Sequence, residues 1–176
     1  MRIAILLAGA AVAAVSAVGS PARGARTPAA LRIPALPGRD ASRSGRCPIP
    51  SRFRRAFARA AGDTALQLSM LVAVAQVESS FRADARSEAD ARGLLQVMPT
   101  TAAALRLDAD IPATNVLAGA RYLRLLVNRF HRTDLALAAY NAGPTVVRAL
   151  GRAPSVETQT YIANVERRWA AVAGCT

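Results

Sequence analysis

Apolar residues recur every three or four positions in successive segments of the chain, between residues 53 and 169. This spacing gathers apolar side chains on one face of a helix, whereas a half-buried strand would alternate them at every second position. Aromatic residues make up only 5% of the chain, so the core is expected to consist of aliphatic helix packing. We therefore predict one mainly α-helical domain with at most a small β element, which would lie within residues 82–96.

Residues that favour helix ends divide this pattern into separate helices. A side-chain oxygen at the start of a helix accepts a hydrogen bond from a free N–H group of the first turn. The residues predicted to do so are Asp63 or Thr64 and Asn115, and the last helix is predicted to begin at Ser155. Glycine readily adopts the backbone conformation that ends many helices, and Gly62 and Gly143 are predicted to end theirs. Pro99 is expected to open a short helix.

The first 46 residues lack this helical pattern. Arg2 is followed by a largely apolar run at residues 3–18. Because about 20 apolar residues are needed to span a bilayer, we predict a cleaved secretory signal at residues 1–20, with a retained anchor as the alternative. Residues 21–46 contain six arginines among many Pro, Gly and Ser residues, which predicts a disordered linker. The folded domain is expected at residues 47–176, exported to the periplasm or cell envelope.

The chain carries a formal net charge of +12, and all 23 of its basic residues are arginines. Its few aromatic residues offer little surface for base stacking, so nucleic acid is not the predicted partner. Behind an export signal, an anionic surface of the cell envelope fits this charge better. The single histidine, His131, has no companion ligands and is expected in a surface loop, and no metal or cofactor is predicted.

Cys47 and Cys175 lie at the two ends of the predicted domain. In an exported protein, an even number of cysteines in these positions indicates one disulfide bond. Two free thiols are the alternative. A metal site is not predicted, because two ligands 128 positions apart with one histidine in the chain form no recognisable set.

Glu78 is the only charged residue between Thr64 and Phe81. Helical spacing places it near the apolar side of its helix, beside Leu71 and Val74. Desolvation there and the negative end of the helix dipole would both raise the pKa of its carboxyl group, as a general acid at neutral pH requires. The alternative is an ordinary solvated glutamate, which is less favoured because no other charge marks a solvent-exposed face of this helix.

Two further stretches carry isolated polar side chains. In "GLLQVMP", residues 93–99, Gln96 is the only polar side chain, and alone it indicates a buried amide with its hydrogen bonds satisfied. In "AYNAGP", residues 139–144, Tyr140 and Asn141 precede a glycine turn at a predicted helix end. By themselves they indicate a core tyrosine and a turn-capping asparagine.

"ESSF" at residues 78–81, followed by these two stretches in this order, resembles the catalytic domain of soluble lytic transglycosylases. That family shares a fold with goose-type lysozymes, so the resemblance implies a lysozyme-like helical domain. The resemblance extends over roughly residues 62–170 and includes "NVLAGARYLRLLV" and "TQTYIANV". Leu95 stands where methionine is frequent in the family, which is a volume-conserving difference.

The resemblance implies a role for each matching residue. Glu78 would be the single catalytic acid and base, and Tyr161 would support it. Ser79 would form a hydrogen bond near the substrate or the acid. The residues expected to line a groove for the glycan are Gln96, Tyr140 and Asn141.

The implied reaction is cleavage of the β-1,4 bond between N-acetylmuramic acid and N-acetylglucosamine in peptidoglycan glycan strands. Glu78 would protonate the leaving oxygen and then act as base, while the N-acetyl group or 6-hydroxyl of the substrate attacks and a 1,6-anhydro sugar forms. If Asp84, Glu88 or Asp90 positioned a water molecule instead, the bond would be hydrolysed as by a lysozyme. A non-catalytic glycan-binding module is the third interpretation, which the presence of Glu78 disfavours.

We expect the protein to be a monomer. Its small size is compatible with general wall turnover and with local wall clearing for an envelope-spanning secretion apparatus, and the sequence does not separate these roles.

Overall fold

The computed structural model describes residues 45–176, which form a helical domain. A 3-10 turn at Ser51–Phe53 precedes the helices α1 (Arg54–Thr64), α2 (Leu68–Glu78), α3 (Pro99–Ala104), α4 (Pro112–Phe130), α5 (Thr133–Ala142), α6 (Pro144–Leu150) and α7 (Val156–Ala171). The β structure of this described part consists of two isolated bridges, Arg86 with Arg92 and Arg92 with Val97. The prediction of a mainly α-helical domain with at most a small β element is therefore confirmed.

The N-terminal predictions fall almost entirely on other residues. The predicted signal at residues 1–20 and residues 21–44 of the predicted linker lie outside the described residues. Between residues 45 and 176, none of the helices combines the length and the apolar character needed to cross a bilayer.

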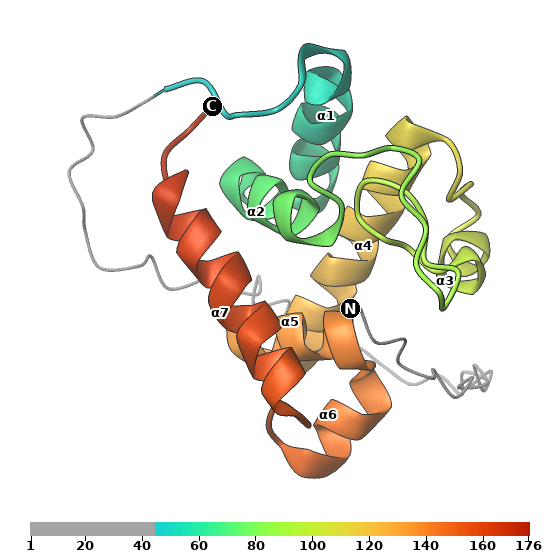
Figure 1. Cartoon of the computed structure of the whole chain (residues 1–176), viewed down its shortest axis with the longest axis vertical. Helices are drawn as coiled ribbons and strands as arrows, with labels where there is room; N and C mark the ends of the chain where they lie inside the picture. Colours follow the sequence, from blue (N-terminus) through green and yellow to red (C-terminus); the bar gives the residue numbers. More distant parts are fainter. Residues whose placement is uncertain (1–44) are drawn as a thin grey trace, which may run out of the picture.

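Helix α2 lies in the centre of the domain. Every residue from 69 to 75 is buried, although apolar spacing predicted burial of one face only. A helix that is apolar all round is stable only when other elements cover every side of it. Helices α1 and α7 pack against α2, and Figure 1 shows α7 beside it and α1 above it. Helix α4 packs against α1 and α5, and α5 packs against α6 and α7.

Some helix ends differ from those predicted. Helix α1 continues through Gly62 to Thr64, and the left-handed residue that follows is Ala65, with φ of 52°. Arg124 of α4 explains the extension, because its guanidinium donates to the carbonyl oxygen of Thr64 at 2.7 Å and to that of Ala65. Helix α2 consequently begins at Leu68, so neither Asp63 nor Thr64 caps it.

Other predicted helix ends are confirmed. The Ser155 hydroxyl accepts a hydrogen bond from the backbone N–H of Thr158 at 3.1 Å at the start of α7. Gly143 follows the last residue of α5, with φ of 91°, and Pro99 opens α3. Asn115 is the exception, because α4 begins at Pro112 and encloses it.

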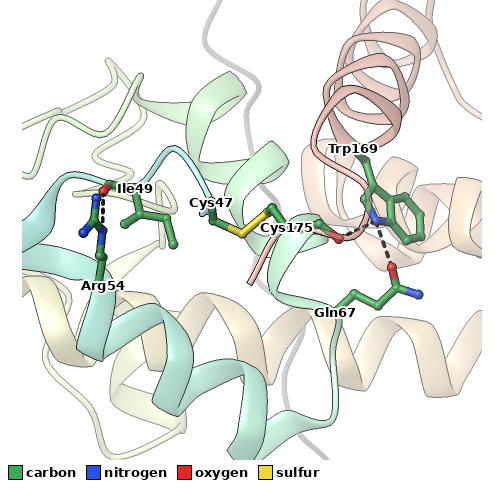
Figure 2. The surroundings of a disulfide bond; sticks show 7 residues. Cys47, Ile49, Arg54, Gln67, Trp169 and Cys175 are labelled. Atoms are coloured by element: carbon green, nitrogen blue, oxygen red, sulfur yellow. Dashed lines mark hydrogen bonds between the residues drawn. A yellow bond between two sulfur atoms is a disulfide. The ribbon is translucent and has the colours of Figure 1, made fainter. Parts of the chain in front are cut away.

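A disulfide bond joins Cys47 to Cys175, as predicted, with 4.8 Å between their Cα atoms. The backbone N–H of Cys47 also donates to the carbonyl oxygen of Thr176 at 3.1 Å, so the two ends of the described chain lie together (Figure 1). Nearby, the indole N–H of Trp169 donates to Gln67 Oε1 and Ser69 Oγ, each at 3.1 Å, which joins α7 to the start of α2 (Figure 2).

Replacing Cys47 and Cys175 together by alanine is expected to lower the free energy of unfolding by about 2–4 kcal/mol, because the bond closes a very long loop of the unfolded chain. Urea denaturation of the oxidised protein and of the double variant measures the difference. The wild-type protein in reductant serves as control and should unfold at the same midpoint as the variant. An unchanged midpoint in both samples would contradict a stabilising bond.

Candidate active site

Glu78 is the last residue of α2 and is partly buried. The hydroxyl of Tyr161, on α7, donates a hydrogen bond to Glu78 Oε1 at 2.7 Å. The two residues are 83 positions apart in the sequence, and the packing of α7 against α2 brings them together. The structure therefore has the contact between Tyr161 and the acid that the family resemblance implies.

Burial and the charge of Glu78 raise the pKa values of two tyrosines, Tyr161 and Tyr140. Burial, followed by the charge of Glu78, raises the pKa of Tyr161 well above its ordinary value. The same two causes, in the same order, raise the pKa of Tyr140. Both phenols consequently remain protonated at neutral pH, so each is a hydrogen-bond donor near the carboxylate. Glu78, Tyr140 and Tyr161 thus form one electrostatically coupled group from α2, α5 and α7.

Side chains from α4, from α5 and from the residue directly after α2 bind the segment at residues 93–97. Ser79 Oγ, directly after α2, donates to the carbonyl oxygen of Leu94 at 2.9 Å. The backbone N–H of Leu95 donates to Asn115 Oδ1 of α4 at 2.9 Å. The hydroxyl of Tyr140, from α5, donates to the carbonyl oxygen of Leu95 at 2.8 Å. These three contacts fix the segment beside the end of α2 that carries Glu78.

Ser79 and Gln96 bind backbone rather than projecting freely. Ser79 is fully buried, and its hydroxyl also lies 3.2 Å from the carbonyl oxygen of Ala75. Gln96 Nε2 donates to the carbonyl oxygens of Ala85 at 3.1 Å and Gly93 at 3.0 Å, and Gln96 itself has a left-handed backbone with φ of 45°. Both residues therefore shape the site, and direct contact of either with a glycan stays a prediction.

Asn141 lies beside Tyr140 in the last turn of α5. Its Oδ1 atom is buried and, within residues 45–176, is the one buried side-chain polar atom without a hydrogen-bond partner in the protein. Buried acceptors are usually satisfied. A ligand group that donates a hydrogen bond would satisfy this one, which agrees with the predicted role of Asn141 in a glycan groove.

Sequence reasoning missed the part that Asn115 plays. The predicted N-cap role is wrong, because Asn115 lies inside the first turn of α4 and is fully buried. Its side chain binds the segment at residues 92–95 instead of its own helix. Pro112 was the available signal, since proline favours the first position of a helix and would have placed Asn115 within the helix.

Two glycines permit this close packing. A Cβ atom on Gly93, which has φ of 71°, would lie 2.6 Å from Asn115 Nδ2. A Cβ atom on Gly119, within α4, would lie 2.6 Å from the Cβ of Leu95 and 2.9 Å from the hydroxyl of Tyr140. All three distances are shorter than the 3.0 Å that a Cβ atom keeps from other heavy atoms, so these positions accept no side chain without movement of the site.

A ring of four charged side chains holds the preceding loop. Arg86 and Arg92 each pair with both Asp90 and Asp110, at N–O distances between 2.6 and 3.2 Å. The hydrogen bond from Arg92 is the main reason why the pKa of Asp90 is below its usual range. Asp90 is therefore held as a paired carboxylate. The remaining acids of this loop, Asp84 and Glu88, are exposed.

A hollow of about 690 Å³ lies beside the chain that follows Glu78. Its lining combines the N-terminal segment with the loop after α2, namely Pro48, Ile49, Pro50, Arg52 and residues 80–84. Glu78 is not among the lining residues, so the hollow adjoins the end of α2 without containing the carboxylate.

Gly119→Ala is expected to destabilise the domain by about 1–3 kcal/mol, because the new methyl group overpacks against Leu95 and Tyr140. Gly62→Ala is the matched control, since its new methyl group has no atom within 4 Å and lies in helix α1. That variant should be more stable than wild type by about 0.5–1 kcal/mol. Urea denaturation measures both changes, and equal stabilisation of the two variants would refute the close packing at Gly119.

Comparison with known proteins identifies relatives for most of the domain. The family model described as Transglycosylase SLT domain matches residues 55–162. The membrane-bound lytic murein transglycosylase F of Cellvibrio japonicus is 36% identical over 92 residues, which is 48% of this chain and 19% of that protein. The soluble lytic murein transglycosylase of Salmonella typhimurium is 30% identical over 143 residues, which is 66% of this chain and 22% of that protein. This chain thus spans about a fifth of the length of either relative.

Solved structures share the fold. An inactive mutant of the lytic transglycosylase Slt from Pseudomonas aeruginosa matches with a TM-score of 0.62 and 29% identity, over 73% of this chain and 25% of that one. The 70 kDa soluble lytic transglycosylase of Escherichia coli matches with a TM-score of 0.62 and 28% identity, over 69% and 24% of the two chains. These matches confirm the predicted lysozyme-like fold. Because the family model covers more than half of the sequence, this chain belongs to the family of proteins with a transglycosylase SLT domain.

Proposed function

We propose that this protein is a peptidoglycan lytic transglycosylase that cleaves the β-1,4 bond between N-acetylmuramic acid and N-acetylglucosamine and leaves 1,6-anhydro-muramic acid ends. The observation that carries the proposal is the carboxylate of Glu78 at the end of a buried helix, bound by Tyr161 at 2.7 Å within an SLT domain. A carboxyl group held by a fixed donor in a partly buried position is suited to proton transfer.

Glu78 acts as the single acid and base. A glycosidase with two carboxylates requires the second one at about 5–5.5 Å or 6.5–9.5 Å from the first. Among the described residues, Glu78 is the one carboxylate whose charge raises the pKa of Tyr140 and Tyr161. Asp90, in the nearby loop, is engaged by Arg86 and Arg92. These observations support a mechanism that needs one carboxylate.

The reaction then proceeds without water. The protonated Glu78 gives its proton to the glycosidic oxygen, and the bond from that oxygen to C1 of N-acetylmuramic acid breaks. The 6-hydroxyl of the same sugar forms a new bond to C1, with or without prior participation of the N-acetyl group, and its proton passes to the Glu78 carboxylate. Tyr161 keeps the carboxylate oriented through both proton transfers. Glu78 is then protonated again, as at the start. The masses of the two products add up to the mass of the substrate.

The comparisons support this assignment. The matched relatives are named lytic murein transglycosylases, and the P. aeruginosa structure is that of an inactive mutant in which a glutamate is replaced by glutamine. Because this chain spans only about a fifth of such relatives, its own activity is part of the proposal. We further propose export to the periplasm or cell envelope, action as a monomer on glycan strands, and attraction of the arginine-rich chain to anionic envelope surfaces.

Glu78→Gln is expected to abolish cleavage, because an amide can neither donate nor accept the required proton. Purified peptidoglycan incubated with wild-type protein should release muropeptides that lack the mass of water, detected by mass spectrometry.

Three results would contradict this proposal. Turnover retained by Glu78→Gln would remove Glu78 from its role. Products that carry the additional mass of water would identify a lysozyme-like hydrolase. Glycan binding with no released muropeptides would identify a binding module.

Tyr161→Phe is expected to lower kcat about tenfold, equivalent to ~1.4 kcal/mol of barrier, because the carboxylate loses its orienting donor. A hydrogen bond donated to a carboxylate favours its ionised form, so Glu78 in the variant should stay protonated to higher pH. The alkaline limb of the kcat–pH profile should therefore move upward.

Tyr122→Phe is the control for this variant. Tyr122 packs against the ring of Tyr140, with 5.5 Å between ring centroids. Loss of the Tyr122 hydroxyl should leave the kcat–pH profile unchanged. An equal shift in both variants would show that the effect does not come from the bond between Tyr161 and Glu78.

A further inference from the structure

Both the oxygen and the nitrogen of the Asn115 side-chain amide form hydrogen bonds with backbone groups. Oδ1 accepts from the N–H of Leu95 at 2.9 Å, and Nδ2 donates to the carbonyl oxygens of Arg92 at 2.7 Å and Ala109 at 2.8 Å. Asparagine and glutamine are the side chains that combine one acceptor with two donor hydrogens on a planar group. Because Asn115 is fully buried and lies against Gly93, the longer glutamine does not fit in its place.

The N–H group of Leu95 belongs to a peptide group in which both the C=O and the N–H are hydrogen-bonded to side chains. The C=O of the peptide group between Leu94 and Leu95 accepts from Ser79 Oγ, and its N–H donates to Asn115 Oδ1. The described chain contains no cis peptide, so these two groups point in opposite directions. One rigid plane therefore connects α4 to Ser79, the residue next to Glu78.

The carbonyl group of Leu95, the next one along the chain, connects this peptide group to Tyr140. The carbonyl oxygen of Leu95 accepts a hydrogen bond from the hydroxyl of Tyr140, whose pKa is raised by burial and then by the charge of Glu78. Leu94 and Leu95 are themselves buried, and Leu95 packs so closely against α4 that a Cβ atom on Gly119 would lie 2.6 Å from its Cβ. A displacement at Asn115 consequently reaches both Ser79 and Tyr140 instead of being absorbed by loose packing.

We propose that Asn115 is a positioning residue for the reaction at Glu78. It fixes the peptide group between Leu94 and Leu95, and that group sets the placement of Ser79 beside the acid and the direction of the Tyr140 hydroxyl. Asn115 acts through these residues without touching the substrate. The proposal rests on the proposed function, since its main readout is glycan cleavage.

Asn115→Ala should lower kcat at least tenfold while KM changes less than threefold, measured per folded molecule at a temperature well below the unfolding midpoint. Asn128→Ala is the matched control, because Asn128 lies on the same helix with its side chain exposed. It should leave kcat and KM unchanged. A residue that served only stability would lower the unfolding midpoint in Asn115→Ala and leave kcat per folded molecule as in wild type, and that result would overturn the proposal.

A double-mutant cycle with Ser79→Ala tests the shared peptide group. If Asn115 and Ser79 act on one plane, the double variant should lose about as much kcat as the worse single variant, because either change already releases the group. Independent losses that multiply would show that the two side chains act separately and would also overturn the proposal.

Asn115→Asp supplies a conservative variant with a distinct pH signature. Its carboxylate still accepts from the Leu95 N–H but faces the carbonyl oxygens of Arg92 and Ala109, and protonation restores one donor. Its kcat relative to wild type should therefore rise at least threefold between pH 8 and pH 5. A ratio that stays constant over this range would contradict a role for the amide donors.

Failure of this proposal is distinguishable from failure of the proposed function. Hydrogen exchange at the Leu95 amide, followed by NMR, should be slow in wild type and fast in Asn115→Ala whether or not the protein cleaves glycan. Wild-type protein that releases no muropeptides refutes the proposed function. Full kcat in Asn115→Ala refutes only the positioning role.

Discussion

Burial of α2 on all of its sides is the constraint on which the rest of the structure depends. A helix without a solvent-exposed face can bring a charged group to the surface of the fold only at its ends, and Glu78 is its last residue. Packing of α7 against α2 then supplies Tyr161 from a distant part of the chain. Hydrophobic packing therefore places the carboxylate, and the hydrogen bond from Tyr161 orients it.

The segment at residues 93–97 shows a second constraint, which is the need for buried backbone groups to form hydrogen bonds. An irregular segment that is buried must still satisfy its backbone N–H and C=O groups. Several of these groups bind side chains, namely those of Ser79 directly after α2, Asn115 of α4, Tyr140 of α5 and Gln96 of the segment itself. The short motifs that mark the family are thus largely a set of backbone partners, and their spacing in the sequence reflects which helices meet at this point.

The fold was predictable because helix formation follows local periodicity, and the start of α7 was predicted at Ser155, the residue directly before its first helical residue, Val156. The site was predictable in part. Nothing local relates Glu78 to Tyr161, which lie 83 positions apart, and only the family resemblance joined them. Asn115 was misassigned because a short polar side chain near a helix start favours the local N–H groups, whereas its actual partner is the Leu95 N–H 20 positions away. Likewise, Gly62 failed as a helix end because Arg124 of another helix binds the carbonyl of Thr64.

The joining of Cys47 to Cys175 also bears on how such a domain is combined with others. Because the polypeptide enters and leaves at one place, the domain is a closed unit whose attachment to further chain does not stretch its helices. Tension or movement applied at either end is carried by the covalent bond and does not pass through α2 or α7. A domain whose ends lie together can be placed within a longer protein without distortion of its helices. The relatives that this chain matches are longer proteins, of which it spans about a fifth.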